Sequence, residues 1–189
     1  MPEEPVFAYA HLNARVQPLD RGDRYEDPLQ EALEANGWGE VTGGGTMQRM
    51  SGEISYCGID LDLNNVKQAV PFICQFLAKC GAPKGSHLQF ELDGDKQEVS
   101  FGILEGLAIY FNGTDLPDEV YADCDINYVY SEIDRLLGKR GGVQGHWQGP
   151  TETALYLYGY SVDEMTTQIK PLMDEYPLCE KARFETIAE

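Results

Sequence analysis

The stretch that decides the fold is Gly39-Glu40-Val41-Thr42-Gly43, which returns 102 residues later as Gly141-Gly142-Val143-Gln144-Gly145. A second pair of similar segments, Tyr56-Cys57-Gly58-Ile59 and Leu157-Tyr158-Gly159-Tyr160, lies at an offset of about 101 residues. Two landmarks that recur at nearly the same spacing indicate an internal repeat, and a repeat constrains the architecture before any single element is assigned. We therefore expect two copies of one supersecondary unit.

Hydrophobic periodicity predicts the same element order in each copy. The elements of the first copy are a strand at 6–12, a helix opening at Asp27, a hairpin of 40–48 and 53–61, a helix capped by Asn64 or Asn65, and a strand at 88–92. Those of the second copy are a strand at 106–112, a helix near 126–137, a hairpin within 142–161, a helix near 162–175 and a strand near 182–187. Each copy is thus βαββαβ, the order of the ferredoxin-like split motif, in which both helices cover one face of an antiparallel sheet.

The fold class that follows is α+β, with two tandem ferredoxin-like repeats at residues 1–93 and 105–189. Residues 94–104 between them alternate as a strand, and Asp93-Gly94 is typical of a hairpin turn, so this extra strand is predicted to extend the first sheet. The strands carry more aromatic residues than strands facing solvent normally do. We therefore expect the two sheets to pack together or to form a groove, within one pseudo-twofold body.

The net charge indicates which partners the protein can bind, and the N-terminus and the cysteines indicate its compartment. The 189 residues hold 14 Lys and Arg against 32 Asp and Glu, a net charge of −18, which disfavours binding to nucleic acid or to an anionic membrane. The acidic start, Met1-Pro2-Glu3-Glu4-Pro5, lacks the basic and apolar regions of a signal peptide. Five cysteines at irregular spacing are typical of reduced thiols, so we expect a cytoplasmic protein. No spacing in the chain predicts a metal site or a cofactor.

Acidic residues gather in one part of the chain. Residues 91–125 hold ten acidic side chains against Lys96 alone. Such a field steers basic proteins toward their binding site. The residues predicted to form this docking surface are Asp115, Asp118, Glu119, Asp123 and Asp125. Two alternatives are a solubilising set of turns and a calcium loop, although the residue order of an EF-hand is missing.

A second set of candidate residues would bind a small ligand. Gly44, Gly45 and Thr46 lie in the first hairpin, where glycines allow backbone amides to approach an anion. The corresponding positions of the second copy hold His146 and Trp147, which are typical of a contact platform. The long polar connection before the first helix adds Arg21, Asp23 and Arg24. The alternatives are structural: a bulge or turn for the glycines, an aromatic cover for Trp147, and an ion-pair network for the connection.

Three functions remain. The leading hypothesis is a cytosolic, non-enzymatic binding protein, monomeric or homodimeric, that offers an acidic surface to a basic protein as an inhibitor, an immunity protein or an adaptor does. The alternative is a small-molecule sensor or carrier with its ligand between the repeats. A small enzyme with a cleft between the sheets, using His146, Trp147 and either Asp23 or Arg24, is the weakest of the three.

Overall fold

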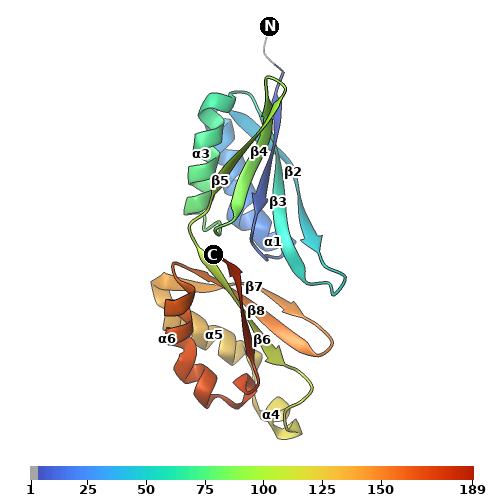
Figure 1. The fold of residues 1–189 in the computed structure, drawn as a ribbon, viewed down its shortest axis with the longest axis vertical. Coiled ribbons are helices and arrows are strands. Elements are labelled where there is room, and N and C mark those ends of the chain that lie inside the picture. Colours follow the sequence, from blue (N-terminus) through green and yellow to red (C-terminus); the bar gives the residue numbers. More distant parts are fainter. Residues whose placement is uncertain (1–3) are drawn as a thin grey trace. The chain divides into compact units, whose positions relative to one another are not determined.

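The computed structural model describes residues 4–189, and its contacts divide the chain into two compact units. Unit 1 comprises residues 4–48 and Ile54–Ile103, and unit 2 comprises Arg49–Glu53 and Leu104–Glu189. Each unit has its own antiparallel sheet and helices (Figure 1). Each also has its own hydrophobic core. None of the described helices is both long and apolar enough to cross a membrane.

Unit 1 is a five-stranded sheet in the order β2-β3-β1-β4-β5. Its elements, in chain order, are β1 (Val6–Leu12), α1 (Pro18–Arg21), a π-helical turn (Gly22–Glu26), α2 (Asp27–Asn36), β2 (Gly39–Gln48), β3 (Ile54–Leu63), α3 (Val66–Lys79), β4 (Ser86–Leu92) and β5 (Asp95–Phe101). The turn between β4 and β5 has positive φ at both Asp93 (55°) and Gly94 (86°), as a type I′ hairpin requires. The predicted extra strand therefore extends this sheet as β5.

Unit 2 is a four-stranded sheet in the order β7-β8-β6-β9. Its elements are β6 (Glu105–Asn112), α4 (Asp118–Asp123), α5 (Ile126–Leu137), a 3-10 turn (Gly138–Arg140), β7 (Gly141–Gln148), β8 (Glu152–Gly159), α6 (Val162–Glu175), a second 3-10 turn (Pro177–Cys179) and β9 (Arg183–Ala188). Without β5, the two sheets have the same strand order, which confirms the α+β class and the two tandem ferredoxin-like repeats.

Capping residues and a terminating glycine place the ends of three helices close to where the sequence predicts them. Asn65 caps α3 by accepting a hydrogen bond from the Gln68 amide, and Ser161 caps α6 in the same way from Glu164. The helix α2 begins at Asp27-Pro28 and ends at Gly37, whose φ of 66° is the left-handed conformation that glycine adopts most easily.

The two hairpins confirm one of the sequence matches and correct the other. Both carry a β-bulge at the same place, between Val41 and Gly43 in unit 1 and between Val143 and Gly145 in unit 2, which fixes the 102-residue offset. Opposite these valines lie Leu61 and Leu157, so the second strands of the hairpins correspond at an offset of 96 rather than 101. The match at Tyr56 was therefore wrong, because the first hairpin is six residues longer than the second.

The predicted polar connection before α2 is also corrected, since residues 18–26 are helical rather than a loop. The side chain of Tyr25 is fully buried in this segment, and its hydroxyl donates to the Gly81 carbonyl. A helical path buries this large ring against the core.

Candidate functional site

The side of the unit 1 sheet opposite its helices is the most distinctive surface of the molecule, and we call it the open face. Along β1, Ala8, Ala10 and Leu12 are buried in the core, and the alternate residues point the other way. The sheet register places the following residues on the open face: Phe7, Tyr9 and His11; Glu40, Gly43, Gly45 and Met47; Tyr56, Gly58, Asp60 and Asp62; His87, Gln89 and Glu91; Lys96, Glu98 and Ser100. Phe7 is 56% exposed, which is unusual for a phenylalanine on a central strand.

A stack of three rings lies on the open face. The His11 ring lies 4.3 Å from the Tyr56 ring on β3 and 4.6 Å from the His87 ring on β4, the last pair nearly parallel at 11°. Burial and the neighbouring His87 lower the pKa of His11, and Glu98 opposes this shift. His87 Nε2 lies 3.9 Å from a Glu98 oxygen, and Gln89 Nε2 donates to the same oxygen at 3.0 Å.

Tyr9 lies across a glycine of the neighbouring strand. A Cβ atom at Gly58 would collide with the Tyr9 ring, so the glycine makes room for it. Burial raises the pKa of Tyr9, with smaller contributions from Tyr56 and Asp60. In the row across the sheet, Tyr9 stands between Asp60 on β3 and Gln89 on β4, with Glu98 on β5 next in line.

The open face is acidic as well as aromatic. Its carboxylates are Glu40, Asp60, Asp62, Glu91 and Glu98, against the one lysine Lys96. A groove of about 670 Å³ continues from Phe7 and Tyr9 to the β4–β5 turn at Asp93 and Gly94. This volume falls in the range of small-molecule pockets, roughly 300 to 1,000 Å³.

The corresponding side of the unit 2 sheet, which we call the covered face, is buried. Tyr110 is 2% exposed, and Tyr156 and Tyr158 are 0% exposed. Both Tyr110 and Tyr156 donate their hydroxyl hydrogen bonds to one oxygen of Glu53, at 2.6 Å and 2.9 Å. Glu53 is itself buried, and its second oxygen lies 3.5 Å from Arg49. The short segment Arg49–Glu53 thus supplies an acceptor that two buried hydroxyls require.

Gly45 and Trp147 occupy equivalent positions at the 102-residue offset. Trp147 packs against the buried tyrosines of the covered face. Above Gly45, by contrast, a Cβ atom would meet no atom within 4 Å. His146 is exposed and points to the other side of β7, so it is separated from Trp147 by the strand itself.

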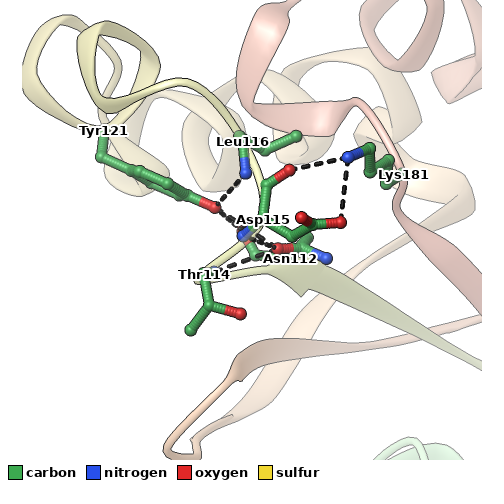
Figure 2. A network of polar contacts seen from close by, with 6 residues as sticks. All are labelled: Asn112, Thr114, Asp115, Leu116, Tyr121 and Lys181. Atoms are coloured by element: carbon green, nitrogen blue, oxygen red, sulfur yellow. Dashed lines mark hydrogen bonds and ion pairs between the residues drawn. The ribbon is translucent and has the colours of Figure 1, made fainter.

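The five predicted docking residues all lie in or beside the connection between β6 and α5 of unit 2, and all are exposed. Asp115 is bound by Lys181, which donates to its carboxylate at 3.0 Å and to its carbonyl at 2.7 Å (Figure 2). Asn112 and Tyr121 hold the backbone of the same connection (Figure 2). Asp125 caps α5. The remaining three, Asp118, Glu119 and Asp123, lie on α4.

Part of the predicted ligand set comes together on the helix side of unit 1. Arg21 donates to Glu26 at 2.8 Å and to the Thr46 hydroxyl at 2.6 Å. A Cβ atom at Gly44 would collide with the Glu26 carboxylate, so this glycine lets an anion of the chain itself approach the strand. Asp23 and Arg24 lie apart from this group, around a shallow pocket with Asp20.

The cysteine thiols and the metal-binding residue types are the remaining candidates for a site. The cysteines are free, and burial raises the pKa of the Cys57 thiol to about 12. Among the described residues, no group of three or more His, Cys, Asp and Glu side chains is placed to hold a metal ion.

Sequence reasoning missed the residues that give the open face its character. His11 and His87 are 76 positions apart in the chain, and only the pairing of β1 with β4 brings them together. One signal was present: Phe7, Tyr9 and His11 alternate with the apolar residues of the first strand, which marks a second, ring-bearing face. Glu53 carries no comparable signal.

Comparisons with known proteins identify no family for this chain. No family model matches the chain, and no curated protein matches it. The first two RRM domains of the yeast poly(U)-binding protein Pub1 align over 97% of this chain and 99% of theirs, at 11% identity and a TM-score of 0.26. A protein of unknown function from Galdieria sulphuraria aligns over 97% and 98%, at 12% identity and a TM-score of 0.29. A Fusobacterium nucleatum protein proposed to be a monooxygenase aligns over 98% and 92%, at 9% identity and a TM-score of 0.31. At these scores the likenesses carry no argument about this chain.

Proposed function

We propose that this protein is a non-enzymatic binding protein that docks a basic protein partner on the open face of unit 1. One observation carries the proposal: the open face combines exposed rings with five carboxylates against one lysine, whereas the equivalent face of unit 2 is buried. Because one fold contains both arrangements, the exposure of the first face is not a requirement of the fold.

The chemistry of the open face favours a cationic protein surface. Aromatic side chains supply contact area at low cost in conformational entropy, and they are enriched at the centres of protein interfaces. Carboxylates around them select cationic partners and speed association. The acidic residues of 113–125 and the net charge of −18 would add a long-range attraction for the same partner.

Affinity capture from a native lysate at low salt tests this function, with two variants of the bait. Gly45→Trp places on the open face the residue that covers the equivalent position of unit 2, and it should abolish capture. Gln75→Trp adds the same ring to the exposed side of α3 and should leave capture intact. Release of a basic protein by a salt step, lost only with Gly45→Trp, would support the proposal. A partner captured equally by both variants would contradict it.

A second candidate function, a small-molecule carrier, is favoured by the groove beside Phe7 and Tyr9. It predicts thermal stabilisation of the purified protein by a metabolite, an effect that grows with ligand concentration. Stabilisation by a metabolite, together with no captured protein, would replace the first proposal with this one.

A further inference from the structure

Unit 2 contains, within itself, a complete example of how this kind of sheet holds a guanidinium group. The Arg183 guanidinium carbon lies 3.6 Å from the centroid of the Tyr110 ring on the central strand β6. Glu152 on β8 accepts two hydrogen bonds from Arg183, at 2.8 Å and 2.9 Å. Glu185 on β9 lies 3.7 Å from a third nitrogen. A ring on the central strand and carboxylates beside it therefore hold one planar cation.

The open face of unit 1 has the same kinds of group without the arginine, but in a neighbouring row: the position equivalent to Tyr110 is His11, and the tyrosine of the open face, Tyr9, lies two residues before it. Tyr9 lies on the central strand β1, Asp60 is its direct partner on β3, and Glu98 stands on the same row at β5. The position equivalent to Arg183 is His87, which stacks on His11 instead of supplying a guanidinium. Tyr9 and Asp60 also lie close enough for the Asp60 charge to raise the Tyr9 pKa.

From this comparison we infer that the open face binds an arginine side chain of the partner, with the guanidinium on the Tyr9 ring and hydrogen-bonded to Asp60. This inference rests on the proposed function and specifies which side chain of the basic partner the open face binds. Arginine is favoured over lysine because its planar group stacks on a ring and presents paired donors to a carboxylate at the same time. On the covered face of unit 2, by contrast, the tyrosines bind an anion: their hydroxyls donate to the carboxylate of Glu53.

Two fluorescein-labelled peptides test the inference, identical in a Gly-Ser background except that one carries three arginines and the other three lysines. Fluorescence anisotropy at low ionic strength should give a dissociation constant about tenfold lower for the arginine peptide, the equivalent of one good charged contact. Tyr9→Leu and Asp60→Asn should each remove this preference. Tyr9→Phe, which keeps the ring, should retain it, as should Glu31→Gln on the exposed side of α2.

The outcomes separate this inference from the proposed function. If the two peptides bind with equal affinity and Gly45→Trp abolishes the binding of both, the arginine site is overturned. The proposed function, a basic partner on the open face, is then retained. An arginine preference that survives both Tyr9→Leu and Asp60→Asn would also overturn the site. Peptide binding that survives Gly45→Trp would overturn the inference and the proposed function together. Asp60→Asn keeps the test decisive if Tyr9→Leu impairs folding, because Asp60 is a partly exposed side chain.

Discussion

Apart from β5, the two sheets share one strand order. The faces that lie opposite their helices nevertheless differ: one is buried and the other is exposed. On the covered face of unit 2, three tyrosines and Trp147 are packed together and Glu53 satisfies two of the hydroxyls. On the open face of unit 1, the equivalents of Trp147 and Ala154 are Gly45 and Gly58, and the rings that remain are partly exposed. The difference teaches that the fold itself needs helices on one face only, and that the other face is available for packing or for binding.

The largest difference between the faces should appear on removal of Glu53. Glu53→Ala leaves the hydroxyls of Tyr110 and Tyr156 without this acceptor, and buried donors that lose a charged acceptor cost about 2 to 4 kcal/mol in unfolding free energy. Urea unfolding curves measure this loss. Glu53→Gln keeps an acceptor oxygen and should lose less. A Glu53→Ala protein as stable as the wild type would mean that Arg49–Glu53 is not anchored by these bonds.

A smaller effect should separate two matched hydroxyl deletions. Tyr156→Phe removes a buried donor from Glu53 and should cost about 1 to 2 kcal/mol in unfolding free energy. Tyr9→Phe removes a hydroxyl from the open face and should change stability by less than about 0.5 kcal/mol. Equal losses in urea unfolding would remove the distinction between an anchored face and a free one.

The smallest effect concerns His11 and pH. Burial and His87 lower the His11 pKa below its ordinary value of 6.5, while Glu98 on β5 acts against them and Tyr56 on β3 packs against the ring. The folded state therefore binds fewer protons than the unfolded state, so this contribution to stability is present above pH 6.5 and is lost as the pH falls through the folded pKa. Unfolding free energies measured between about pH 8 and pH 5 should decline less in His11→Gln than in the wild type. An NMR titration that places the His11 pKa above its ordinary value would contradict the assignment.

The sequence was sufficient for the repeat and for most elements, because periodicity and capping are local properties. The glycine and valine pattern at 39–43 and 141–145 marks a bulge that both hairpins form. The correspondence of Gly44 and Gly45 with His146 and Trp147 was also available from the sequence, and its second pair, Gly45 and Trp147, is the position where the two faces differ most.

What the sequence could not supply is the outcome of non-local pairing. The six extra residues of the first hairpin change the offset of the following strand from 102 to 96, so the segment at Tyr56 does not correspond to the one at Leu157. The helical path of residues 18–26 depends on the burial of Tyr25. The charged residues around Tyr25 make the segment look like an exposed loop in the sequence. The stack of His11 on His87 depends on the register of β1 and β4. The hydrogen bonds to Glu53 depend on the path of the segment between β2 and β3.

The most direct test of the central claim is a chemical-shift map of the full chain titrated with the three-arginine peptide. If the open face is the docking site, the largest backbone amide shifts will fall on β1, β3 and β4 of unit 1, at and beside Tyr9, His11, Asp60 and His87. Shifts confined to residues 113–125 of unit 2 would contradict the account and assign docking to the acidic connection around Asp118 and Glu119.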